Sequence, residues 1–255
     1  MFHQKDDNIL NGLEREETIY RIFPLKRFIE LIKSKQLVLV TPEMWDDPFE
    51  NFFLKADAYD KQGNLVDLSN LRNAWFGQCW TKNADTDAMW RIYSPNKDGV
   101  RVKTTVGKLF DAIYDERDKF SRLRYFIGQV EYKTKQELES FMSGITVSDM
   151  MFGGQNKWLA ASLLIKRDAF LHENEVRLLV NEVNSDEAKL YNGLYKVSID
   201  VISLIEEVCL DPRLGKEEYE FYQEAIKSLI GEGIPIEKSD LYEYNFDPIP
   251  LESKP

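Results

Sequence analysis

Residues 173–180 place three charged side chains at every second position of an apolar run, and this pattern restricts the fold more than any other segment. The apolar residues between the charges alternate as in a β-strand with two different faces: Val176, Leu178 and Val180. Glu173, Glu175 and Arg177 should then share the opposite face. A folded protein rarely lines one strand face with three charges unless that face is wet, pairs internally or binds a ligand. An exposed strand, with Arg177 paired to a carboxylate, is the alternative that this segment leaves open.

Length and composition predict one globular domain spanning residues 1–255. Of the 255 residues, 43% are hydrophobic and 13% are aromatic, which is enough to build a sizeable core. No internal repeat or linker-sized polar stretch divides the chain. The 33 basic and 44 acidic residues give a net charge of -11, and this excess of acid opposes a broad nucleic-acid-binding surface.

Cysteine and histidine are too sparse for the common metal sites. The chain has two cysteines, Cys79 and Cys209, and two histidines, His3 and His172, without the spacing of metal ligands. We therefore expect no metal. No apolar run approaches about 18 residues and the N-terminal residues lack a signal-peptide pattern, so no membrane partner is expected. We expect a cytoplasmic protein, in which free thiols are normal.

The order of predicted strands and helices favours an α+β fold. Alternating or β-branched runs predict strands at residues 18–23, 37–40, 76–81, 100–106, 128–132, 173–180 and 193–197. Helical spacing predicts helices at residues 25–36, 85–93, 109–113, 135–142, 157–171 and 219–229. Pro24 suits a first helical position, and Asp85 suits a helix cap. The strands outnumber a regular alternation of strand and helix, which argues against a doubly wound sheet.

Arg21 lies in the first predicted strand, on a face that it shares with Ile19 and Phe23. A guanidinium in such apolar surroundings needs a partner. Its planar fork of donors can clamp a phosphate. A structural pair with a carboxylate at the rim of the core is the other interpretation.

Aromatic side chains gather soon after the third predicted strand. They are Trp80, Trp90 and Tyr93, with Thr81 and Met89 beside them. A stripe of this kind usually belongs to the core. Its functional interpretation is a stacking wall for a heteroaromatic ring, to which Tyr93 or Thr81 would add a polar contact.

A turn at residues 46–50 carries three carboxylates, from Asp46, Asp47 and Glu50, around Pro48. Carboxylates in a turn can hold a hard cation. The turn has too few oxygens at regular spacing for a calcium loop, and a helix cap with a buried Phe49 is the alternative.

Several segments together carry a resemblance: Tyr20-Arg21, the turn at 46–50, Cys79-Trp80-Thr81, Met89-Trp90 with Tyr93 and Gly99, Val130-Glu131-Tyr132, Glu173-Asn174-Glu175-Val176-Arg177-Leu178 and Asp211-Pro212-Arg213. In this order they resemble a bacterial family labelled only as domain of unknown function family number 2971. The resemblance covers nearly the whole chain and is specific as an ordered set. Because the family is mostly uncharacterised, it implies little about function.

The same landmarks are also similar to those of ADP-ribosyltransferases of the Arg, Ser/Thr, Glu-x-Glu type. This resemblance implies a single domain of split antiparallel sheets flanked by helices. It also implies that Arg21 contacts a phosphate or ribose of NAD, that Thr81 shapes the nicotinamide pocket and that Glu175 engages the nicotinamide ribose. Glu173 would orient or deprotonate an acceptor. The remaining NAD-binding candidates are Tyr20, Trp80, Trp90 and Tyr93. The chain departs from the pattern in having Cys-Trp-Thr in place of Ser-Thr-Ser.

The chemistry implied by this resemblance suits the residues. Cleavage of the nicotinamide glycosidic bond builds positive charge on the ribose, and a nearby carboxylate such as that of Glu175 stabilises it. We therefore expect NAD as a substrate, a protein or nucleic acid as the acceptor, and a toxin or antiviral defence role. A noncatalytic nucleotide-sensing or protein-interaction module is the alternative. A metal-dependent nuclease using Asp47, Glu173 and Glu175 is disfavoured, because Arg177 stands where such enzymes have Lys.

Overall fold

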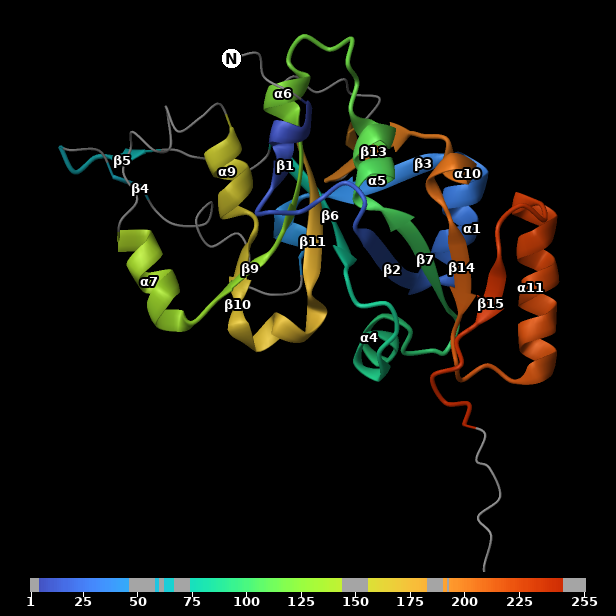
Figure 1. Ribbon diagram of the computed structural model, residues 1–255. Coiled ribbons are helices and arrows are strands. Elements are labelled where there is room, and N and C mark those ends of the chain that lie inside the picture. The colour runs from blue at the N-terminus through green and yellow to red at the C-terminus, as the bar shows by residue number, and fades with distance from the viewer. Residues whose placement is uncertain are drawn as a thin grey trace, which may run out of the picture.

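The computed structural model describes residues 5–45, 58–59, 62–66, 74–143, 156–182, 190–191 and 193–244 (Figure 1). The acidic turn predicted at residues 46–50 lies outside them. Within the described residues, the chain forms one large sheet and two small sheets, with helices packed on both faces of the large sheet. In this part of the chain, no helix has the length and apolar character needed to cross a membrane.

The large sheet contains eleven described strands: β1 (Ile9–Leu10), β2 (Thr18–Pro24), β3 (Gln36–Val40), β6 (Trp75–Thr81), β7 (Gly99–Thr105), β8 (Tyr125–Gln129), β11 (Glu175–Asn181), β12 (Leu190–Tyr191), β13 (Leu194–Ser198), β14 (Glu207–Leu210) and β15 (Ile236–Lys238). Its main order is β1-β8-β11-β6-β2-β7-β14-β15. The β1–β8 and β14–β15 pairs are parallel, and the other described pairs of this sheet are antiparallel. The small sheets pair β4 (Ala58–Tyr59) with β5 (Leu65–Val66), and β9 (Glu131–Lys133) with β10 (Ile165–Arg167).

The helices flank this sheet without alternating regularly with its strands, so the predicted α+β class is confirmed. The described α-helices are α1 (Leu25–Ser34), α4 (Asp87–Tyr93), α5 (Val106–Ile113), α6 (Ser121–Arg124), α7 (Lys135–Ser143), α9 (Lys157–Ser162), α10 (Val201–Leu204) and α11 (Lys216–Ile230). Short 3-10 helices are η1 (Lys5–Asn8), η2 (Pro42–Met44) and η3 (Asp168–Glu173). Figure 1 shows α9 on one side of β11 and α1, α5, α10 and α11 on the other.

Strand β11 runs through the middle of the sheet, between β6 and β8. Its apolar residues Val176, Leu178 and Val180 pack in the main core, which α1, α5, α10 and α11 cover. On the opposite face Leu179 joins a second core with α9. All seven residues of β11 are buried, so the alternative of an exposed strand is wrong and the charges on this strand pair inside the protein.

The sheet opens along one edge of β6. β2 pairs with this edge only at Tyr20–Thr81, and β3 pairs with it only at Val40–Gly77. Helix α1 connects β2 to β3, so the two strands separate where the chain turns away from the sheet. Between the two contacts, the Gln78 side chain donates a hydrogen bond to the carbonyl oxygen of Val38 (2.9 Å), which partly replaces the interrupted ladder. This opening leaves room for a pocket.

Several local predictions were wrong because contacts between distant segments decided the conformation. The predicted helix at 157–171 ends at Ser162, since β10 pairs in parallel with β9 and η3 follows. Pro24 ends β2 in an extended conformation (ψ 143°) and precedes α1. Thr86, rather than Asp85, caps α4 by accepting the N–H of Met89 (3.3 Å).

Glu173 does not belong to the strand that follows it. It ends η3, and Asn174 then adopts a left-handed conformation (φ 43°) before β11 begins. Asn suits this conformation because its short polar side chain tolerates a positive φ. The prediction that Glu173 shares a strand face with Glu175 is therefore wrong, although the two side chains still meet, as described below.

Candidate functional site

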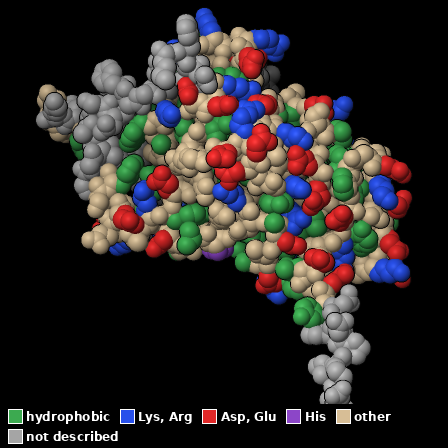
Figure 2. Space-filling view, viewed as in Figure 1, with side chains coloured by type: hydrophobic (Ala, Val, Ile, Leu, Met, Phe, Trp, Pro, Cys, Tyr) green, Lys and Arg blue, Asp and Glu red, His purple; other side chains and the backbone are tan. Residues whose placement is uncertain are grey.

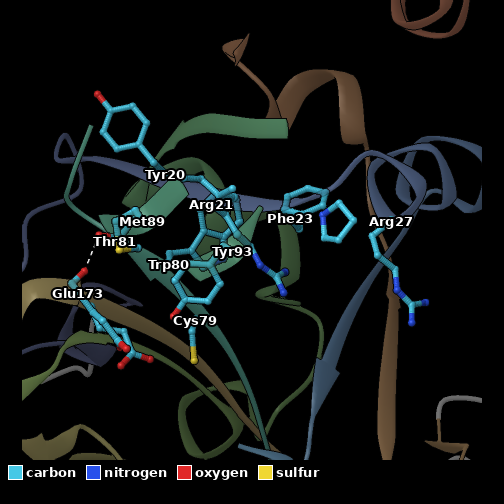
Figure 3. Close-up of a pocket in the computed structure, with 13 residues that line it drawn as sticks. Tyr20, Arg21, Phe23, Arg27, Cys79, Trp80, Thr81, Met89, Tyr93 and Glu173 are labelled. Atoms are coloured by element: carbon cyan, nitrogen blue, oxygen red, sulfur yellow. Dashed lines mark hydrogen bonds between the residues drawn. The ribbon is translucent and has the colours of Figure 1, made fainter. Parts of the chain in front are cut away.

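A pocket of about 320 Å³ lies at the opening between β2 and β6. The residues that line it are Tyr20, Arg21, Ile22, Phe23, Pro24, Arg27, Cys79, Trp80, Thr81, Met89, Tyr93, Glu173 and Glu175. Figure 3 shows Glu173 and Arg27 on opposite sides, with Arg21, Cys79 and Tyr93 between them. The prediction that Arg21, Trp80, Thr81, Tyr93 and Glu175 line one pocket is confirmed.

Glu175, the first residue of β11, accepts hydrogen bonds on both of its carboxylate oxygens. Arg177 donates from Nε to Oε1 (2.8 Å) and from Nη2 to Oε2 (3.0 Å). Lys166 Nζ donates to Oε2 (3.2 Å), and the Cys79 thiol adds a further hydrogen bond. Because an ionised carboxylate offers about four acceptor positions, these four donors are sufficient to occupy them.

Lys166 also contacts Glu173, with 2.5 Å between Nζ and Oε2, and so joins the two carboxylates. We call Lys166, Glu173, Glu175 and Arg177 the charge cluster. Each of the four is at most 8% exposed. Two positive and two negative charges make the cluster neutral overall, which offsets the free-energy cost of removing the charges from water.

The charge cluster keeps Glu175 ionised. Burial by itself would raise the pKa of Glu175, but the charge and hydrogen bonds of Arg177, with smaller contributions from Lys166 and Cys79, lower it to about 2. A carboxylate with so low a pKa is a poor proton acceptor at neutral pH. Glu175 can therefore supply a fixed negative charge and a hydrogen-bond acceptor, but it is unsuited to act as a general base.

Arg21 is the charged group of the pocket that has no counter-ion in the described part of the chain. Among the described residues, no carboxylate lies within 4 Å of its guanidinium and no group accepts a hydrogen bond from it. It lies over the Phe23 ring, 5.4 Å from the ring centroid. Burial lowers the pKa of Arg21, against the opposing influence of Cys79 and Tyr93, yet a guanidinium stays protonated at neutral pH. An anionic ligand group would stabilise this charge.

Thr81 and Tyr93 connect the carboxylate side of the pocket to its remaining wall. Thr81 Oγ1 donates to the carbonyl oxygen of Glu173 (2.5 Å) and accepts the N–H of Asn83 (3.0 Å), so it ties η3 to β6. Burial, together with the negative charge of Glu173, raises the pKa of the Tyr93 phenol. Tyr93 is therefore a neutral hydroxyl donor with a flat ring at the pocket wall.

The other predicted aromatic contacts differ in how far they reach the pocket. Trp80 borders it, but the indole belongs to the main core and its N–H donates to Gln78 (2.9 Å). Tyr20 also borders it, while its ring lies under the Arg101 guanidinium, 5.2 Å away, and points away from Arg21 in Figure 3. Trp90 is fully buried and does not line the pocket, because α4 turns this side chain toward β2 and β14. The structure therefore places Tyr93 and Phe23, rather than Trp90, at the pocket wall.

The Asp211-Pro212-Arg213 segment holds the end of α4 that carries Tyr93. The Ser94 hydroxyl donates to Asp211 (2.5 Å), and Arg213 donates both to Asp211 and to the carbonyl oxygen of Ser94 (2.6 Å). Burial would raise the pKa of Asp211, but the hydrogen bonds from Arg213 and Ser94 lower it. This part of the resemblance thus corresponds to a structural contact that fixes one wall of the pocket.

The sequence analysis missed several side chains of the site, among them Lys166, Cys79, Phe23 and Arg27. Phe23 and Cys79 had a usable signal, since each lies two residues from a predicted site residue on the same strand. Lys166 had none, because it lies in a segment predicted to be helical. Among the described residues, no group of three or more His, Cys, Asp or Glu side chains is placed to hold a metal ion, and Asp47 lies outside this part of the chain.

Residues 89–178 match the family described as "Protein of unknown function (DUF2971)", so the resemblance to that family is confirmed over this segment. The segment includes Glu173 and Glu175 but not Arg21 or Thr81. No curated protein is significantly similar in sequence. Among solved structures, the chain is similar to "Thermus sp. 2.9 DarT in complex with NAD+", with 10% identity, a TM-score of 0.40, and coverage of 91% of this chain and 100% of that one. It is likewise similar to "Thermus sp. 2.9 DarT in complex with ADP-ribosylated ssDNA", with 10% identity, a TM-score of 0.41, and coverage of 92% and 99%.

The charge cluster predicts a pH-dependent effect of Arg177→Met on stability. This substitution removes the main partner of a buried carboxylate, so we expect the free energy of unfolding at pH 7 to fall by about 3–5 kcal/mol. In the wild type, the pKa of Glu175 lies below its usual value of 4.5. The ion pair of Glu175 with Arg177 therefore stabilises the fold above pH 4.5, and this stabilisation is lost as the pH falls toward 2.

In the variant, burial is no longer opposed by Arg177 and the carboxylate takes up a proton at a higher pH. The stability difference between wild type and variant should therefore shrink between pH 7 and pH 4, as measured by urea unfolding. An equal difference at both pH values would show that Arg177 stabilises the fold by packing and not through the charge of Glu175.

Proposed function

We propose that the protein is an NAD-consuming ADP-ribosyltransferase or NAD glycohydrolase. The observation that carries the proposal is a single pocket bordered by Arg21, whose guanidinium has no carboxylate partner among the described residues, and by Glu175, whose pKa is lowered to about 2. A dinucleotide presents to such a pocket an anionic pyrophosphate and a ribose that becomes cationic during the reaction. The two opposite charges of the pocket match these two parts.

In this proposal, each wall of the pocket has a separate task. Arg21 binds the pyrophosphate, and Arg27 lies beyond it on the side of the pocket opposite Glu173 (Figure 3). Tyr93 and Phe23 offer ring faces beside Arg21 for the nicotinamide. The low pKa of Glu175 suits it to stabilise the developing ribosyl cation, because that task requires a fixed charge and no proton transfer. No residue in this arrangement calls for a metal.

The acceptor is a protein or a nucleic acid, or water in the case of hydrolysis. Glu173, which lies at the pocket and is hydrogen-bonded through its main chain to Thr81, orients or deprotonates this acceptor. On the face drawn in Figure 2, acidic and basic side chains are interspersed, so any acceptor contact on that face would be local. The proposal includes one domain over residues 1–255, a cytoplasmic location and a toxin or antiviral defence role.

Glu175→Gln tests the role of the fixed charge. The purified wild type should release nicotinamide from NAD in the presence of a metal chelator. The variant should lose about a hundredfold in rate, because roughly 3 kcal/mol of electrostatic stabilisation disappears from the transition state. The measurement is the initial rate of nicotinamide release, with the folded fraction of each variant followed by its unfolding curve.

A matched control is Glu182→Gln. Glu182 is also a buried carboxylate (6% exposed) that pairs with an arginine, Arg124, but it does not line the pocket. It should lose stability without a comparable loss of rate. Equal rate losses in the two variants would mean that Glu175 acts only through folding. Turnover by the wild type that requires magnesium would favour a metal-dependent nuclease instead.

Glu173→Gln tests the separation of tasks between the two carboxylates. If Glu173 acts on the acceptor and Glu175 on the ribose, the variant should depress transfer to a target far more than hydrolysis of NAD by water. Labelled NAD distinguishes the two channels, since label bound to protein or nucleic acid is counted against free ADP-ribose. Equal losses in both channels would contradict the separation.

The alternative is a noncatalytic nucleotide-sensing or protein-interaction module. The observation that favours it is the saturation of Glu175: Arg177, Lys166 and Cys79 already occupy its acceptor positions, so a ribose hydroxyl must displace one of these donors. If the protein binds NAD but releases no nicotinamide during a long incubation, this alternative is favoured.

A further inference from the structure

Lys166 is the member of the charge cluster that reaches both carboxylates. It lies in β10, outside the large sheet, and its Nζ is 2.5 Å from Glu173 and 3.2 Å from Glu175. Its ammonium also lies over the Phe170 ring, 4.7 Å from the centroid. Lys166 does not line the pocket, so it reaches a bound substrate only through the two glutamates.

The two carboxylates depend on this ammonium because they are close together and buried. Two carboxylates that share a site away from water repel each other, and one of them normally keeps a proton at a pH well above its usual range. Arg177 is hydrogen-bonded to Glu175 through two nitrogens, whereas Lys166 forms an ion pair with Glu173. Loss of Lys166 would therefore remove from the charge cluster the ammonium that contacts both carboxylates.

We propose that Lys166 is a positioning residue that holds Glu173 and Glu175 side by side and keeps both of them ionised at the pocket. This inference rests on the proposed function and deepens it, because it names the group that allows one carboxylate to face the ribose while the other faces the acceptor. Through this contact, β10 and η3 become part of the reaction site although only Glu173 of these two elements lines the pocket.

Other charged or titratable groups around the pair must be considered in any test by pH. Among the described residues they are Arg177 of β11, Cys79 of β6, Tyr93 of α4, Tyr132 of β9, His172 of η3 and Arg21 of β2. The pKa values of Tyr93 and Tyr132 are raised by burial, so neither phenol ionises near neutral pH. His172 is exposed and adjacent to Glu173, so it requires its own control.

The test compares Lys166→Met, which keeps the length of the side chain without its charge, with Lys166→Arg, which keeps the charge. Nicotinamide release is measured from pH 5 to pH 9. Lys166→Met should lower kcat with little change in KM. The acid limb of its pH–rate profile should lie at least about one pH unit higher than that of the wild type. Lys166→Arg should restore most of the wild-type profile, and His172→Gln should leave it unchanged.

A second measurement does not depend on turnover. Carbon-13 NMR of labelled glutamate carboxyls follows the titration of Glu173 and Glu175, which are assigned by their Gln variants. One of the two should titrate at a higher pH in Lys166→Met than in the wild type. If the titration and the rate profile keep their wild-type shape while only stability falls, Lys166 has a merely structural role and the inference is overturned. If the wild type releases no nicotinamide but the NMR shift is seen, the proposed function fails while the electrostatic role of Lys166 stands.

Discussion

The pairing of four buried charges at the head of β11 is the interaction on which the rest of the site depends. None of the four can be removed alone without leaving an uncompensated charge away from water. The cluster also connects separate elements, because Lys166 comes from β10, Glu173 from η3, and Glu175 and Arg177 from the central strand. Pairing inside the protein therefore does two things: it stabilises the fold and places two carboxylates beside a pocket.

The second determinant is the separation of β2 and β3 along β6. A continuous ladder would have closed this edge, whereas single contacts at Thr81 and Gly77 leave an opening that receives side chains from both sides. Arg21 enters it from β2 without a carboxylate partner among the described residues. Among the described residues, the pocket thus has an uncompensated positive charge on one wall and a neutralised carboxylate pair on another. This asymmetry suits a ligand that is itself unevenly charged.

Local periodicity predicted the parts of this arrangement that depend on one segment. The alternation around Val176 predicted β11, and the face shared with Ile19 placed Arg21 correctly. It could not predict Lys166, because apolar residues at helical spacing masked a strand that forms only by pairing with the distant β9. It also could not decide between Trp90 and Tyr93, since the rotation of α4 against β2 determines which ring faces the pocket.

The central claim is that NAD binds in this pocket, between Arg21 and the charge cluster, and alkylation of Cys79 tests it most directly. Cys79 lines the pocket and is partly exposed, whereas Cys209 is buried, so a thiol reagent should modify Cys79 first in the folded protein. The account predicts that added NAD slows this modification to a saturating limit, and that Arg21→Ala weakens the protection by removing the phosphate partner. Modification of Cys79 at an unchanged rate in the presence of excess NAD would contradict it.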